Sequence, residues 1–202
     1  MRAAFQYSLK RRPFFRLERL MMILPIPTPE APDGLDPGVT AQLETMPPLN
    51  VLWMLGRTGW LEVISAALSR MFDPGQFPAA DRETMILRIA AHTGVDYPIP
   101  QHRVFAGNVG MSDEVVQAII NREFAALDPW TVELCRICEE ITDKVTLTEA
   151  SLARLVEHYG KNGAAQAVWL MGWFNMLVRF VGSTRIPIEA DLEAAAALTR
   201  PT

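Results

Sequence analysis

The sequence predicts an all-α protein built as a single domain. Its 202 residues suit one domain, with or without a tail. Half of the residues are apolar, which is ample for a core, and Ala, Leu, Met and Glu are abundant. Val, Ile and Thr do not gather in the alternating runs of half-buried strands. We therefore expect about six to nine helices around one core.

The first 35 residues are expected to form an extended arm outside this core. Residues 1–20 hold six basic residues and one acidic residue, a net charge of +5, which leaves −9 for the rest of a chain of −4. Residues 23–38 contain five prolines and two glycines, so regular structure is not expected there. The basic segment is either a targeting or surface-binding arm or a tail, including an extension from an upstream start codon.

Three helices are expected before the middle of the chain. The first spans residues 37–46, with Asp36 as its N-cap. Residues 49–60 and 61–72 form two helices, or one helix broken near Gly56. Their apolar residues recur on one face, which predicts that they pack on a core.

The central stretch, Asp81 to His102, is predicted to hold a helix, a glycine stop and the start of a second helix. The first helix spans residues 78–93. Gly94 ends it, since glycine adopts the left-handed conformation without strain. Asp96 is the expected N-cap of the second helix, which places His102 about one turn inside. The apolar stripe of the first helix contains Met85, Ile86, Ile89 and Ala90, and Pro98 and Pro100 fit the first turn of the second.

The following helices each have a start signal. They begin after Ser112, Asp128 and Thr148, which are residues typical of N-caps. The second of them should reach about Asp143, and Gly160 should end the third.

The last strong helix, residues 164–181, is apolar nearly all round. A membrane span is not expected, because Gln166, Asn175 and Arg179 interrupt it and such groups are costly in lipid. We expect this helix to be buried in a core or in a subunit interface.

The central stretch also carries a resemblance to a known family. The run R-E-x-x-x-L-R-x-A-A-x-T-G at residues 82–94, followed after seven residues by His102, resembles the carboxymuconolactone decarboxylase and alkyl hydroperoxidase D superfamily. The segment GWFNMLVRF, residues 172–180, is similar to a late motif of the same superfamily. The resemblance covers residues 36–187, most of the chain.

The two branches of that superfamily differ at the redox cysteines. The peroxidase branch has a glutamate, a cysteine twelve positions later, a second cysteine three positions on and a histidine four positions further. Glu83 and His102 match the acid and the histidine. Val95 and Pro98 stand at the two cysteine positions, so the resemblance implies the decarboxylase branch, which needs no thiol pair and no cofactor.

The resemblance further implies a helical domain of the alkyl hydroperoxidase D-like type over residues 36–190, followed by a tail at 191–202. It implies self-association as a homodimer, trimer or hexamer. Glu83 and His102 would be the catalytic pair, moving a proton at carbon beside a carbonyl or protonating the dienolate left when carbon dioxide departs. On spacing alone, Glu83 could instead pair with a neighbouring arginine while His102 is a satisfied core residue.

Five residues are candidates for substrate binding, each with a structural alternative. Tyr97 could donate its hydroxyl into a pocket or simply pack. Arg103 suits a substrate carboxylate, or the surface. Trp53 lies in a part that walls the pocket in the resembling family, although core packing is the plainer interpretation. Asn175 and Arg179 are four positions apart on one helix, so they share a face and could meet one buried partner.

Cys135 and Cys138 form a C-x-x-C pair that we interpret as packing residues. A reactive thiol needs a helix N-terminus or basic neighbours, whereas these lie inside a predicted helix beside Glu133 and Glu139. Free cysteines are usually buried. No second Cys or His pair has the spacing of zinc ligands, so no metal is expected.

Composition limits the remaining functions. The net charge of −4 argues against a nucleic-acid partner, and two cysteines make no disulfide framework, which favours a reducing, cytoplasmic compartment. The expected function is a carboxy-lyase-like, cofactor-free enzyme acting on a small carboxylated lactone or enolisable acid. The alternative is a non-catalytic ligand-binding or assembly protein, and a thiol peroxidase is least expected.

Overall fold

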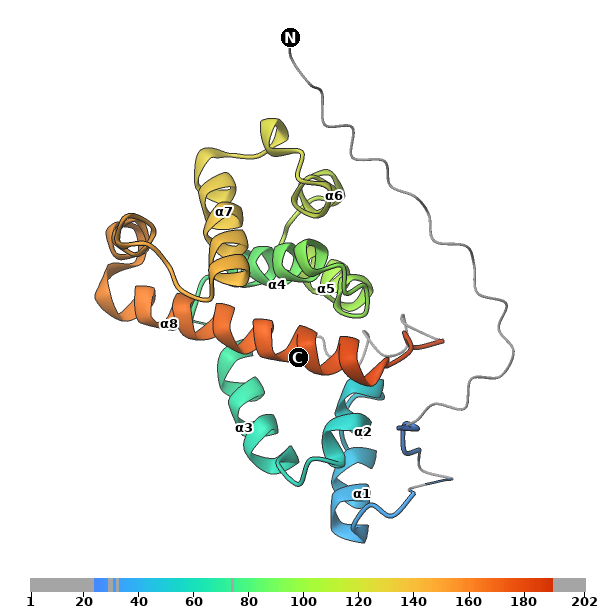
Figure 1. Ribbon diagram of the computed structural model, residues 1–202. Coiled ribbons are helices and arrows are strands. Elements are labelled where there is room, and N and C mark those ends of the chain that lie inside the picture. The colour runs from blue at the N-terminus through green and yellow to red at the C-terminus, as the bar shows by residue number, and fades with distance from the viewer. Residues whose placement is uncertain (1–23, 29–30, 32, 74, 191–202) are drawn as a thin grey trace.

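The fold is all-helical over the residues that the structure describes, as the composition predicts. The computed structural model describes residues 24–28, 31, 33–73 and 75–190 (Figure 1). These hold no strand. The elements are α1 (Pro37–Glu44), α2 (Asn50–Gly56), α3 (Leu61–Phe72), α4 (Ala79–Thr93), α5 (Pro98–Asn108), α6 (Asp113–Asn121), the 3₁₀ turn η1 (Phe124–Ala126), α7 (Pro129–Lys144) and α8 (Glu149–Thr184).

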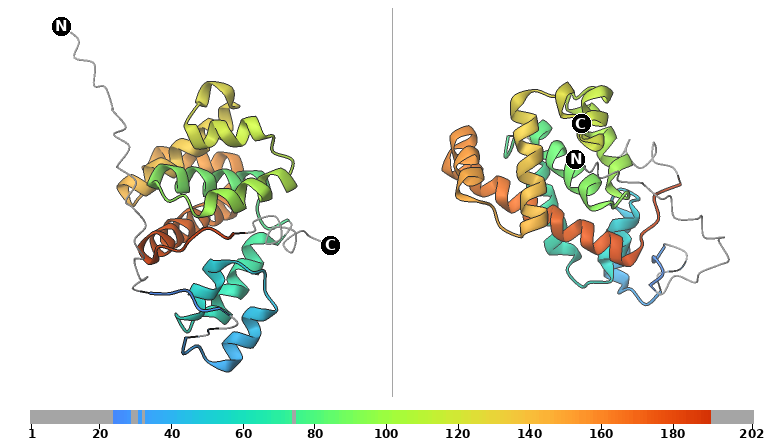
Figure 2. Two further views of the ribbon diagram at one scale, coloured as in Figure 1. Left: turned by 90° about the vertical axis from the view of Figure 1, so that its right-hand side faces the viewer. Right: turned by 45° about the horizontal axis from the view of Figure 1, so that its top comes forward.

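Helix α4 is the centre of the fold, since it packs against α5, α6, α7 and α8. The C-terminal part of α8 runs between two groups of helices, with α1–α3 on one side and α4–α7 on the other (Figures 1 and 2). The largest hydrophobic cluster joins α4, α7 and α8. From α4 it contains the predicted stripe Met85, Ile86, Ile89 and Ala90, each at most 2% exposed. Burial of one such large side chain stabilises the fold by about 1.5–3 kcal/mol.

The predicted helix starts are mostly confirmed. Asp36 accepts a hydrogen bond from the Gly38 N–H at 2.7 Å. Asp128 Oδ1 accepts from the Trp130 and Thr131 N–H groups at 2.9 and 3.1 Å. The hydroxyls of Ser112 and Thr148 cap α6 and α8 in the same way.

The predicted Asp96 cap is wrong. The residue before α5 is Tyr97, and no side chain caps this helix. Pro98 has no N–H to satisfy, and the Ile99 N–H donates to the backbone carbonyl of Asp96 at 3.1 Å. A side-chain acceptor is therefore not needed.

Several helix ends lie within a few residues of the predicted ones. Gly94 ends α4 with φ of 69°, the expected left-handed value. Residues 50–72 form two helices rather than one, because the chain leaves helical geometry after Gly56. The helices predicted on either side of Gly160 form one long element, α8, bent at that glycine (φ 71°, ψ 176°).

The predicted terminal segments are described only in part. Residues 24–28, 31 and 33–35 have no regular structure, as expected for a proline-rich arm. Residues 1–23 and 191–202, on which the basic-arm and tail predictions fall, lie outside the described residues. Among the described residues, no helix has the length and apolarity needed to cross a membrane.

Candidate acid–base site

Glu83 and His102 are in direct contact. Glu83 Oε2 and His102 Nδ1 are 2.7 Å apart, a short distance typical of a charge-assisted hydrogen bond. Glu83 is fully buried, and the His102 side chain is 12% exposed. The structure thus brings together the two residues that the sequence selects as a pair.

The α4–Gly94–α5 turn produces this contact. Glu83 lies in the second turn of α4 and His102 in the second turn of α5. Gly94 adopts a left-handed conformation that is strained for other residue types, and it lets the chain reverse within a few residues. The two helices then pack side by side.

Arg82 provides the second partner of the Glu83 carboxylate. Its Nε donates to Glu83 Oε1 at 3.1 Å, and its Nη1 donates to the Met71 carbonyl at 3.3 Å. The guanidinium carbon also lies 4.3 Å from the centre of the Phe72 ring, a cation–π contact. A buried carboxylate needs such a compensating charge, so the site is a triad of Arg82, Glu83 and His102.

The triad fixes the protonation geometry of the imidazole. The Arg82 guanidinium favours the ionised form of Glu83, and an ionised carboxylate can only accept, so in that form Nδ1 carries the proton that His102 donates. In the neutral ring Nε2 is then the unprotonated nitrogen. Nε2 has no hydrogen-bond partner among the described residues.

Aromatic side chains surround the imidazole. The ring centres of Phe105, Phe72 and Phe174 lie 5.2, 6.2 and 6.4 Å from that of His102. These rings come from α5, α3 and α8, and they exclude water from most of the imidazole. Such a wall strengthens the electrostatic interaction of His102 with Glu83.

The two positions where the peroxidase branch carries cysteines have packing roles. Pro98 is the first residue of α5 and is buried. Val95 lies against Gly182 of α8, where an added Cβ would stand 3.2 Å from the valine methyl.

Cys135 and Cys138 are buried and free, as predicted. They belong to two different hydrophobic clusters, Cys135 with α5 and α6 and Cys138 with the main core. Burial raises the pKa of Cys135 to about 12 and that of Cys138 well above its usual value. These thiols are therefore poor nucleophiles at neutral pH.

None of the five predicted substrate-binding residues hydrogen bonds to Glu83 or His102. Trp53 is 7% exposed and packs among Leu43, Leu55 and Leu61. Arg103 donates to the side-chain oxygen of Gln117 on α6.

Asn175 and Arg179 share a face, as their spacing predicts, but they bond to one another instead of meeting one common buried partner. Arg179 Nη1 donates to Asn175 Oδ1 at 2.8 Å. Asn175 is buried and donates to Thr142 Oγ1 at 3.1 Å, whereas Arg179 is exposed. Tyr97 is the fifth candidate, and its hydroxyl contacts Glu189 beyond the end of α8.

Sequence reasoning missed one member of these sites and gave another only as an alternative. Arg82 is the local arginine partner that the sequence leaves open for Glu83, although adjacent helical positions usually point about 100° apart. Glu189 carries no signal, because it lies after the last recognised motif and reaches Asn50 and Tyr97 only in the folded chain.

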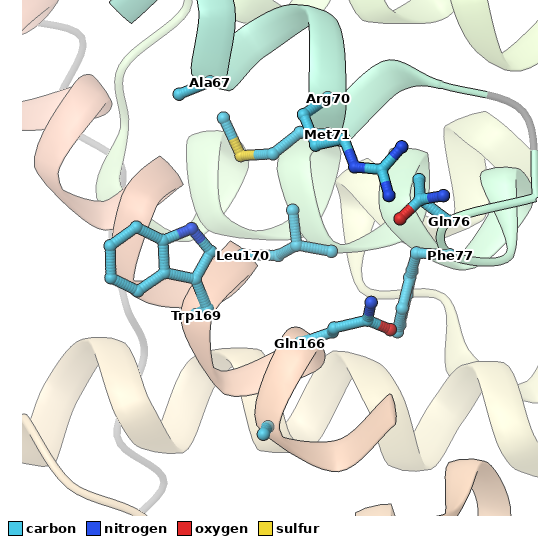
Figure 3. A pocket seen from close by; sticks show the side chains of 9 residues that line it. Ala67, Arg70, Met71, Gln76, Phe77, Gln166, Trp169 and Leu170 are labelled. Carbon is cyan, nitrogen blue, oxygen red and sulfur yellow. The ribbon is translucent and has the colours of Figure 1, made fainter. Parts of the chain in front are cut away.

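Two hollows lie beside the triad, and neither is lined by Glu83 or His102. One, of about 490 Å³, is lined between α3 and α8 by side chains that include Met71, Phe77 and Trp169 (Figure 3). A second, open hollow is lined by Phe72, which contacts His102. Within the described chain, no three acidic, His or Cys side chains stand close enough to hold a metal ion.

Comparisons with family models, curated proteins and solved structures find no match to this chain.

Proposed function

We propose that this protein is a cofactor-free acid–base enzyme of the carboxymuconolactone decarboxylase-like superfamily, acting on a small carboxylated lactone or enolisable acid. The observation that carries the proposal is the 2.7 Å contact between Glu83 and His102. A buried carboxylate that orients an imidazole is an arrangement suited to proton transfer.

The proposed roles follow from the geometry. His102 exchanges a proton at Nε2, Glu83 holds the ring through Nδ1, and Arg82 balances the charge of Glu83. In decarboxylation, the bond to the departing carboxylate breaks and its electron pair enters the dienolate. The imidazolium then delivers the Nε2 proton to carbon, and water restores it.

The redox alternative has little support. Val95 and Pro98 can form neither a thiolate nor a disulfide. Cys135 and Cys138 are fully buried and hard to ionise.

The test is proton NMR in deuterated buffer with a panel of carboxylated γ-lactones and β-keto acids. Wild type should decarboxylate a panel member or exchange its α-proton. Glu83→Gln and His102→Gln should lose about 10²-fold or more of that rate. His92→Gln is the matched control, because His92 binds Asp143 at 2.8 Å outside the triad and should keep full activity. Equal activity in wild type and the three variants would show that Glu83 and His102 do not take part in the reaction.

A second candidate is a non-catalytic ligand-binding or assembly protein of the same superfamily. The observation that favours it is that neither Glu83 nor His102 lines any of three hollows in the described residues, of about 490, 640 and 700 Å³. Two results together would favour this candidate. No member of the panel would react, and one member would raise the melting temperature of both wild type and His102→Gln saturably. The superfamily resemblance also leads us to expect self-association.

A further inference from the structure

Three hydrogen-bond donors from separate parts of the chain meet at the carboxylate of Glu189. The Asn50 backbone N–H donates to Oε1 at 2.8 Å. The Tyr97 hydroxyl donates to the same oxygen, and the Gln101 side-chain amide donates to Oε2. Both carboxylate oxygens thus have neutral donors, and no cation takes part among the described residues.

Two of the donors are buried, and one of them is fixed by a second hydrogen bond. Tyr97 and Gln101 are 7% and 6% exposed. The Tyr97 hydroxyl accepts from the Val51 N–H at 3.0 Å, which directs its own proton towards Glu189. Burial and the neighbouring Glu189 raise the pKa of Tyr97, so the hydroxyl stays a donor.

Gln101 also has an unsatisfied acceptor at this place. Its side-chain oxygen is buried and finds no hydrogen-bond partner among the described residues. A native fold rarely leaves such a group alone without a functional or solvent-mediated reason. Glu189 therefore uses only the donor half of the Gln101 amide.

Glu189 reaches the donors on an exposed strap. Helix α8 ends at Thr184, and Pro187, Ile188 and Ala190 are exposed. A hydrogen bond from the Asn50 side chain to the Pro187 carbonyl at 3.0 Å ties the strap to α2.

One of the donors, Tyr97, lies at a hollow that could hold the carbon skeleton of a ligand. This open hollow of about 640 Å³ lies between the start of α5 and the end of α8. Its walls combine the apolar Val95, Val178 and Val181 with the cationic Arg179 and Arg185. Apolar walls with a few polar groups are typical of small-molecule sites.

We propose that Asn50, Tyr97 and Gln101 form a carboxylate-binding subsite, which Glu189 occupies as an intramolecular ligand and from which a small carboxylic acid displaces it. The donors match a carboxylate in number and direction. The inference concerns binding, and it stands whether or not Glu83 and His102 turn over a substrate.

The test is chemical rescue of a vacated subsite. Glu189→Ala removes the side-chain atoms that acetate would replace. Acetate should raise the melting temperature of Glu189→Ala saturably and by clearly more than that of wild type. Acetamide has the same shape as acetate without the charge, and it should not raise the melting temperature of Glu189→Ala. Sodium chloride at equal ionic strength is the control for a general salt effect.

The matched variant removes one donor. In Glu189→Ala/Tyr97→Phe the rescue by acetate should weaken at least tenfold in half-saturating concentration. Equal acetate effects in wild type and Glu189→Ala, or undiminished rescue in the double variant, would overturn the proposal. If Glu189→Ala does not fold, Glu189→Gln replaces it, and acetate should shift its Gln101 side-chain amide signals more than those of wild type. Equal shifts would again overturn the proposal.

Discussion

Cys135 and Cys138 show how the surroundings of a residue decide its chemistry. Both thiols are fully buried, and the pKa of Cys135 is raised to about 12 by burial. We predict that native protein at pH 8 reacts with Ellman's reagent at least about 100-fold more slowly than a free thiol. Both thiols should react at once in denaturant. Rapid reaction of the two thiols in the native protein would contradict their burial.

The same burial gives a pH dependence of stability. An unfolded cysteine ionises near pH 8.5, so above that pH the unfolded chain binds fewer protons than the folded one. Since the folded pKa of Cys135 is about 12, its contribution to stability should fall as pH rises from about 8.5. Urea unfolding measures this effect. Between pH 7 and pH 10, the free energy of unfolding should fall less for Cys135→Ala than for wild type.

Residue-level prediction from the sequence succeeds where one helix contains the answer. The burial of Cys138 follows from the stripe of α7, and the Asn175–Arg179 contact follows from their spacing. The pairing of Glu83 and His102 was predicted through the superfamily resemblance, because spacing alone favours a local arginine partner for Glu83. In fact Glu83 has both partners, since its two oxygens bind Arg82 and His102 separately.

At the scale of elements, the bend of α8 depends on Gly160. Its φ of 71° and ψ of 176° lie in a region that only glycine adopts readily. We predict that Gly160→Ala lowers the free energy of unfolding by about 1–3 kcal/mol. Urea denaturation measures the change.

Gly172 is the matched control for this prediction. It lies inside the same element, and an added Cβ would meet no atom within 4 Å. Gly172→Ala should therefore raise the free energy of unfolding by about 0.5–1 kcal/mol. If both substitutions had the same sign, the bend at Gly160 would not be a glycine requirement.

Helix starts and stops were largely predictable because they rest on local chemistry. Asp36, Ser112, Asp128 and Thr148 each cap a helix with their own side chain. The Asp96 cap failed because two prolines near the start of α5 remove the N–H donors that a cap serves.

At the scale of the whole molecule, large apolar side chains remain exposed on α8 and before α3. Trp169 is 64% exposed and Trp60 is 65% exposed. Exposed aromatic residues of this size suit an interface between copies of the chain. The arrangement of the helices around α4 could not be predicted from local patterns, because packing order depends on contacts distant in sequence.

We predict that sedimentation velocity finds a species of two, three or six copies of the 22.6 kDa chain. Trp169→Glu should shift the distribution towards the single chain, because a charge in a buried interface is costly. Leu152→Glu, on the first part of α8, is the control and should leave the mass unchanged. A wild type that sediments as a single chain at micromolar concentration would contradict the prediction.

The claim that the whole account depends on is that Glu83 holds the imidazole of His102 so that Nε2 is free to exchange a proton. Nitrogen-15 NMR of histidine-labelled wild-type protein tests it without a substrate, with the pH raised until the histidine signals stop changing. His102 should show a protonated Nδ1 and an unprotonated Nε2. His92 is the internal control with the opposite pattern, because its Nε2 faces Asp143 at 2.8 Å. A protonated Nε2 on His102 would contradict the account.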